Sequence, residues 1–149
     1  MTGTGKTTTI AALVSALVRR GATVLITAFT NTAVDHVLRK IQAAGTLDMT
    51  TTARLLPRSA AVAAPPDIAH LVLRPEDFKS TSDLQARLGK VTVMATTCQN
   101  MQHPLLRRRV FDMCIVDEAS QVLLPSNCVC VCVCMCVCVC VCVCVCLRT

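Results

Sequence analysis

The spacing of hydrophobic positions predicts two amphipathic helices in the first third of the chain. Over about residues 7–20, one helical face is formed by Ile10, Leu13, Val14, Leu17 and Val18. Over about residues 32–44, a second face is formed by Val34, Val37, Leu38 and Ile41. Both sets follow the i, i+3, i+4, i+7 spacing that places side chains on one side of a helix. Gly21 and Gly45 follow the two segments directly, as is typical of helix ends.

Short apolar runs between and after these segments predict buried strands. They are "TVLITAF" (23–29), "VTVMATT" (91–97) and the start of "FDMCIVDEASQ" (111–121), with a further candidate at "ARLLP" (53–57). A short helix is predicted near 82–88, whereas residues 46–80 contain four prolines and are expected to be irregular. Strands that alternate with helices predict an α/β fold with a mostly parallel sheet covered on both faces.

Length and charge restrict the possible classes of protein only moderately. A chain of 149 residues corresponds to about one domain. The net charge of +6, from 15 basic and 9 acidic residues, weakly favours polyanionic partners such as nucleotides or nucleic acid. With no Trp or Tyr and three Phe, the chain has few aromatic platforms on which bases could stack. The start of the sequence lacks the basic region followed by an apolar run that would predict a signal peptide.

The end of the chain has a different composition. Ten of the 12 cysteines alternate with valine from Cys128 to Cys146, and Met135 is the one interruption. A repeat of guanine and thymine reads as GTG and TGT codons, which encode valine and cysteine, and ATG differs from GTG by one base. We therefore divide the chain into a partial domain over 1–127 and a low-complexity tail over 128–149 that a dinucleotide repeat encodes.

Beside its origin in a dinucleotide repeat, three functional interpretations of the tail remain open. Metal binding is disfavoured, because cysteines at i and i+2 of a strand stand about 6.6 Å apart and no turn brings them together. Residues 128–147 are uncharged and apolar and long enough to cross a membrane, although alternating β-branched valines disfavour a helix. An uncharged segment of period two without proline is also typical of aggregating β-structure.

The candidate chemistry begins with the string "TGTGKT" at residues 2–7. Its small residues let backbone N–H groups approach phosphates at the start of a helix, Lys6 would reach the β- and γ-phosphates, and the Thr7 hydroxyl would bind Mg²⁺. The full pattern G-x-x-x-x-G-K-[ST] puts its first glycine one residue before Met1, so we interpret the chain as part of a longer protein. The predicted nucleotide-binding residues are Gly3, Thr4, Gly5, Lys6, Thr7, Thr8 and Gln121.

A second chemical element follows the last predicted strand. In "MCIVDE" four apolar residues precede Asp117 and Glu118, which therefore emerge at the carboxyl end of a strand, where ligands bind in parallel sheets. Asp117 would hold Mg²⁺, and Glu118 would polarise the attacking water. A lysine, a metal and a carboxylate supply the positioning and charge neutralisation that phosphoryl transfer needs. We predict that Lys6, Thr7, Asp117 and Glu118 converge around one magnesium-bound triphosphate.

These strings, taken in order, resemble motifs I, Ia, Ic and II of the superfamily 1 helicases. The resemblance covers about residues 1–125 and rests on "GTGKTTTI", "TNTAVD", "VMATTC" and "FDMCIVDEASQ". It is strongest for the branch that holds the eukaryotic DNA replication ATP-dependent helicase/nuclease and its RNA-acting relatives. It implies a RecA-like domain that couples ATP hydrolysis to movement along single-stranded nucleic acid, DNA rather than RNA, in the nucleus.

The resemblance also implies roles for further residues. Motif Ia contacts the backbone of the strand, a role that would fall to Thr30 and Asn31, and the segment after "VMA" adds Thr96 and Thr97. For Thr30 and Asn31 the alternative is a plain helix N-cap. Hydroxyl and amide groups suit contacts of this kind with nucleic acid, which position a strand without reading its sequence. Gln121 would lie near the metal and sense the γ-phosphate or the following motif.

The resemblance implies that hydrolysis takes place between two RecA-like domains, of which this sequence shows one. We therefore expect a second such domain as a partner, and little ATP hydrolysis and no unwinding by this chain alone. The alternatives are a short protein without an ATPase cycle, which aggregates or is tethered to a membrane through its tail, and an RNA helicase of the same branch. A compact P-loop kinase would leave "TNTAVD" unexplained.

Overall fold

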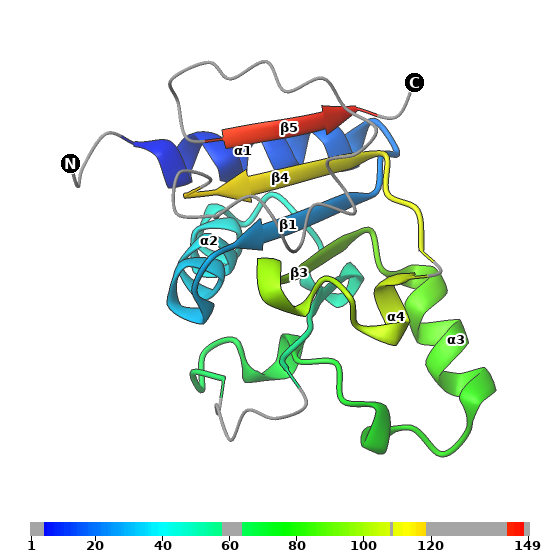
Figure 1. Cartoon of the computed structure of the whole chain (residues 1–149). Helices are drawn as coiled ribbons and strands as arrows, with labels where there is room; N and C mark the ends of the chain where they lie inside the picture. The colour runs from blue at the N-terminus through cyan, green and yellow to red at the C-terminus, as the bar shows by residue number, and fades with distance from the viewer. Residues whose placement is uncertain (1–4, 58–63, 108, 119–142, 148–149) are drawn as a thin grey trace.

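The computed structural model describes residues 5–57, 64–107, 109–118 and 143–147, and its centre is a five-stranded sheet (Figure 1). The order across the sheet is β2-β3-β1-β4-β5. The first four of these are parallel, and β5 pairs antiparallel with β4. The strands are β1 (Val24–Ala28), β2 (Thr52–Arg54), β3 (Val93–Thr97), β4 (Met113–Asp117) and β5 (Val143–Leu147).

The helices confirm the α/β alternation that the hydrophobic spacing predicts. They are α1 (Lys6–Arg19), α2 (Asn31–Ala44), α3 (Thr81–Lys90) and α4 (Pro104–Arg107). Four 3₁₀ turns complete the described part: η1 (Met49–Thr51), η2 (Ala69–Leu71), η3 (Pro75–Asp77) and η4 (Cys98–Asn100). At the end of α2, Gly45 adopts φ 60°, a left-handed conformation that glycine reaches without steric cost.

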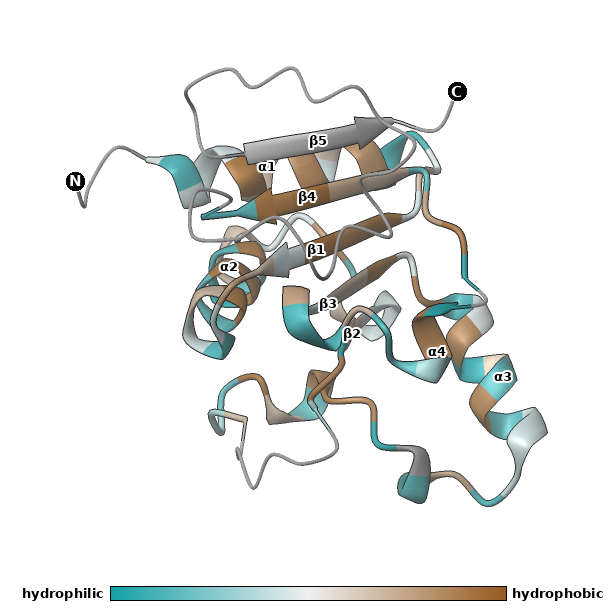
Figure 2. Ribbon diagram, viewed as in Figure 1, coloured by the Kyte–Doolittle hydropathy of each residue, from teal (hydrophilic) through white to brown (hydrophobic). Residues whose placement is uncertain are grey.

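The sheet is covered on both faces, as the apolar runs predict. One core lies between the sheet and the two long helices α1 and α2, and a second core lies on the opposite face under α3 and α4. All five residues of β1 are buried; Ile26 faces the first core and Leu25 the second. In Figure 2 much of β1, β3 and β4 is brown, which marks hydrophobic residues, and the helices α1 and α2 alternate between brown and teal.

Residues 46–80 are more than a connecting loop, although they contain little regular structure. Where the sequence predicts a strand at 53–57, the structure has the shorter strand β2, which begins one residue earlier and ends at Arg54. Farther along, Ile68 and Leu71 are buried in the core under α1 and α2. Asp67 forms an exposed ion pair with Arg39 of α2 at 2.6 Å, and this hydrogen bond lowers the pKa of Asp67. The segment therefore packs against α2 through both apolar and charged contacts.

Most of the tail lies outside the described residues, including 128–142. Its residues 143–147 form strand β5, which pairs with β4 at the edge of the sheet. In the described part of the chain, no helix has both the length and the apolar character that crossing a membrane requires. The division of the chain at residue 127, the metal-binding interpretation of the tail and its membrane interpretation stay predictions.

Candidate functional site

The parallel strands end together, so their last residues form one row at the carboxyl edge of the sheet. Ala28 of β1 is in register with Thr97 of β3 on one side and with Asp117 of β4 on the other. Because registered residues of parallel strands point to the same face, all three side chains share the face to which Ala28 belongs. That face carries α1 and α2. Asp117 therefore projects toward the helix that follows the glycine-rich loop.

Helix α1 begins at the same edge. Its first residue is Lys6, and the arrowheads of β1 and β4 in Figure 1 point to the side on which α1 starts. Gly5 is the N-cap residue, with φ 72° and an open space where a Cβ would lie, so backbone conformation and not crowding requires glycine there. Its carbonyl accepts hydrogen bonds from the Thr9 N–H at 2.9 Å and from the Thr9 hydroxyl at 3.2 Å.

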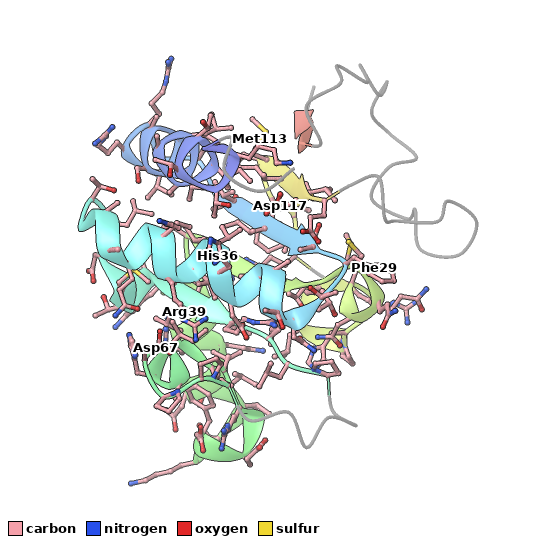
Figure 3. All side chains as sticks on the ribbon, turned by 90° about the vertical axis from the view of Figure 1, so that its left-hand side faces the viewer. Phe29, His36, Arg39, Asp67, Met113 and Asp117 are labelled. Atoms are coloured by element: carbon pink, nitrogen blue, oxygen red, sulfur yellow. The ribbon has the colours of Figure 1, made fainter. Side chains whose placement is uncertain are left out.

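The structure thus brings six of the nine predicted nucleotide-site residues to one edge of the sheet: Gly5, Lys6, Thr7, Thr8, Asp117 and Glu118. Lys6 and Thr7 lie half-buried in the first turn of α1, and Thr8 beside them is exposed. Figure 3 shows Asp117 at the end of β4, and Glu118 follows it directly. The other predicted members of the site are Gly3, Thr4 and Gln121, which lie outside the described residues.

The donor set at this edge suits a hard divalent cation. Asp117 is 8% exposed, and one oxygen accepts the Glu118 N–H at 3.0 Å. No ion pair within the described residues involves Asp117, so its carboxylate stays available as a ligand. Those residues contain no cluster of three or more His, Cys, Asp or Glu side chains that could hold a metal. Mg²⁺ uses one or two carboxylates together with phosphate and water oxygens, so Asp117 and the Thr7 hydroxyl fit it.

Glu118 has a strained backbone. Its φ of 56° is the only positive value among the described residues other than glycine, and the left-handed region costs a side-chain-bearing residue about 1 kcal/mol or more. Such strain is found preferentially at functional sites, where the surrounding structure holds it in place. The left-handed backbone of Glu118, the first residue after β4, turns the chain away from the direction of the strand.

We expect Glu118→Gly to be more stable than Glu118→Ala by about 1 kcal/mol in the free energy of unfolding. Both variants lose the carboxylate, but only glycine relieves the left-handed backbone. Urea denaturation of the two variants measures the difference, and Ala serves as the matched control for the lost side chain. Equal stabilities would show that the backbone at Glu118 is not strained.

The candidate strand-binding residues fall into two groups with different surroundings. Thr30 is the N-cap of α2, since its hydroxyl accepts the Ala33 N–H at 3.1 Å, and Asn31 is the first residue of that helix. The capping alternative therefore holds for Thr30, and its contact with nucleic acid stays a prediction. Asn31 is half-buried, and its side-chain oxygen accepts a hydrogen bond from Arg54 at 2.7 Å.

Thr96 and Thr97 lie deeper than the sequence suggests. Thr96 is fully buried; its hydroxyl donates to the Leu55 carbonyl at 3.1 Å and accepts from the Asn100 amide at 2.9 Å. Thr97 is 4% exposed. The Thr96 hydroxyl therefore has a structural role that connects β3 to the residue after β2 and to η4. The direct contact of Thr96 and Thr97 with a strand stays a prediction.

Sequence reasoning missed a buried ion pair next to Asn31. Arg54 of β2 is fully buried, and its Nε lies 3.0 Å from Oδ1 of Asp35, which is itself buried in α2. Burial lowers the pKa of Arg54, while the hydrogen bond and the charge of Asp35 oppose that shift. An arginine inside the apolar run "TARLL" was the available signal, because a buried charge needs a partner.

Comparisons with known proteins identify a matching family and several similar proteins. The family model described as an AAA domain matches residues 1–126. The DNA replication ATP-dependent helicase/nuclease DNA2 of Xenopus laevis is 40% identical over 131 residues, and its human counterpart is 38% identical over 127 residues. The helicase/nuclease JHS1 of Arabidopsis thaliana is 37% identical over 130 residues.

The alignments cover 84% of this chain but only 12%, 12% and 9% of the Xenopus, human and Arabidopsis proteins. The chain thus spans about a tenth of the length of these relatives. The parallel sheet, the glycine-capped helix and the carboxylates at its edge are consistent with the nucleotide and metal binding that the family implies. Because the family model covers most of its length, the chain belongs to the AAA domain family, and its sequence is similar to that of the DNA replication ATP-dependent helicase/nucleases.

Proposed function

We propose that the chain binds ATP with Mg²⁺ at the carboxyl edge of its sheet, as part of a helicase motor. The observation that carries the proposal is the direction of Asp117, which projects from β4 toward the face on which α1 begins with Lys6. Lys6 would neutralise the β- and γ-phosphates, and the Gly5–Lys6 backbone would donate to phosphate oxygens.

Asp117 and the Thr7 hydroxyl would hold the metal ion. Bound Mg²⁺ would neutralise charge on the phosphate oxygens, which is the main chemical demand of phosphoryl transfer. Glu118 would orient and polarise the attacking water, and its left-handed backbone turns it out of the line of β4. Gln121 would sense the γ-phosphate. Full turnover would depend on a second RecA-like domain that closes the nucleotide cleft.

We further propose that the polynucleotide bound by this part of the motor is single-stranded DNA. The relatives are named as DNA replication helicase/nucleases, and the chain carries a net charge of +6. Thr30 and Asn31, at the start of α2, offer hydroxyl and amide groups that can contact sugar and phosphate oxygens. Action in DNA replication or repair, in the nucleus, follows from the same proposal.

Asp117→Asn tests the metal site. A fluorescent ATP analogue is titrated into the wild-type chain and the variant, with Mg²⁺ and then with EDTA. We expect Mg²⁺ to tighten binding about tenfold in the wild type and less than about twofold in Asp117→Asn, because the variant lacks the charged ligand; tenfold is about 1.4 kcal/mol.

Asp77→Asn is the matched control, since it makes the same change on the exposed turn η3. It should keep the full Mg²⁺ effect. Equal Mg²⁺ effects in the wild type and in Asp117→Asn would show that Asp117 does not bind the metal.

Parallel titrations of the wild-type chain with labelled oligothymidylate and oligouridylate distinguish DNA binding from RNA binding. Tighter binding of the RNA would favour an RNA helicase of the same branch.

A further inference from the structure

Arg54 occupies a position that the sheet otherwise fills with apolar side chains. It is in register with Ala95 of β3, which in turn is in register with Ile26 of β1 and then with Ile115 of β4. All three neighbours are fully buried in the core under α1 and α2. A guanidinium at this place loses its hydration, and a side chain like those of its neighbours would avoid that loss.

The guanidinium is held by three hydrogen bonds of different kinds. Its Nε donates to Asp35 at 3.0 Å, its Nη1 donates to the Leu55 carbonyl at 2.6 Å, and its Nη2 donates to Oδ1 of Asn31 at 2.7 Å. The first two bonds give the guanidinium a counter-charge and a carbonyl acceptor, and they hold it between β2 and α2. The third ends on the residue that opens α2, next to the N-cap Thr30.

This third bond determines which way the Asn31 amide faces. A guanidinium carries only donors, so the amide must present its oxygen to Arg54 and turn its NH₂ group away. Within the described part of the chain, that NH₂ group donates to no acceptor, and the residue is half-buried and not enclosed. Two oriented N–H donors are thus directed away from the core at the start of α2.

We propose that Arg54 is a positioning residue for nucleic-acid binding, because it orients the Asn31 amide so that its NH₂ group donates to the backbone of the bound strand. The inference rests on the proposed function and adds a mechanism to it. Phosphate and sugar oxygens accept hydrogen bonds, so an amide that rotated freely would present its oxygen to them part of the time. Arg54 removes that unfavourable orientation before the strand arrives.

The purely structural alternative is an ion pair that only connects β2 to α2. That connection needs Arg54 and Asp35 and involves no amide, since the two charges already satisfy each other. It predicts that Asn31 contributes equally to binding whether or not the ion pair exists. The positioning role predicts that the contribution of Asn31 depends on Arg54.

A double-mutant cycle on single-strand binding separates the two roles. Asn31→Ala is made in the wild-type chain and in the background Asp35→Leu with Arg54→Met, which replaces the whole ion pair by apolar side chains. Fluorescence anisotropy with labelled oligothymidylate reports the affinity of each of the four proteins. We expect Asn31→Ala to weaken binding about three- to tenfold in the wild type and less than about 1.5-fold in the apolar background.

A second variant leaves the ion pair untouched. Asn31→Asp keeps an oxygen for Arg54 to bond and replaces the NH₂ donor by a second oxygen; a carboxylate in the first turn of a helix does not weaken the helix. We expect Asn31→Asp to lose at least as much affinity as Asn31→Ala while its thermal unfolding midpoint stays at the wild-type value or rises. Arg39→Gln, which breaks an exposed pair on the same helix, is the control for a lost arginine.

Each outcome is decisive. Equal effects of Asn31→Ala in the two backgrounds would overturn the positioning role, even though the chain binds DNA. Unchanged affinity of Asn31→Asp would overturn it as well, and this measurement stands if the apolar background does not fold. Absence of any oligothymidylate binding by the wild-type chain would overturn the proposed DNA binding and this inference together.

Discussion

Lys6→Ala is expected to weaken ATP binding by between about tenfold and about a hundredfold. Lys6 opens α1 at the carboxyl edge of the sheet and is the cation that the phosphate loop offers to the β- and γ-phosphates. A hydrogen bond to a charged group contributes roughly 1.5–3 kcal/mol, which corresponds to that range of affinities. Titration of a fluorescent ATP analogue in the presence of Mg²⁺ measures the change.

The loss must come from the phosphate contact and not from folding or general electrostatics. Alanine has a high helix propensity, so α1 should remain intact. Lys40→Ala removes the same charge from an exposed position on α2, and it should leave ATP affinity within about twofold of the wild type because exposed distant charges are screened. If Lys6→Ala bound ATP as tightly as Lys40→Ala, the glycine-rich turn would be a plain helix start.

The hydrophobic pattern was sufficient to predict the elements that form the carboxyl edge. An apolar run such as Val24–Ala28 is too short for a typical helix and favours a strand covered on both faces, and the helical faces of α1 and α2 follow the i, i+3, i+4 spacing closely. Since parallel strands end at the same edge, the position of Asp117 after an apolar run also predicted its place relative to α1.

The pattern failed where long-range pairing decides the structure. The extent of β2 depends on its pairing with β3, which no local signal encodes, and burial of Ile68 depends on the packing of an irregular segment under α2. Burial of Thr96 had the same origin, because its hydroxyl bonds a carbonyl that is 41 residues away in sequence. The positive φ of Glu118 likewise has no signature in a string of two acidic residues.

Asp35→Ala is expected to destabilise the fold by about 3–5 kcal/mol, because it leaves the Arg54 guanidinium buried without its counter-charge. That is a large part of the ~5–15 kcal/mol that typically stabilises a domain. The measurement is urea denaturation followed by circular dichroism. Asp67→Ala is the matched control, since Asp67 pairs with Arg39 of the same helix α2: that ion pair is exposed, at 42% and 51% of the two side chains, and its loss should have far less effect on the free energy of unfolding.

The paired replacement of Asp35 by leucine and Arg54 by methionine should behave differently from either single change. It removes both charges together, so no desolvated group is left unpaired, and the free energy of unfolding should equal or exceed that of the wild type. A fold that keeps its stability without the ion pair but binds single-stranded DNA less tightly would separate the two consequences of Arg54. A loss of about 3 kcal/mol or more in the paired variant would instead mean that the ion pair is needed for folding, and that the apolar row of the sheet cannot be completed at this position.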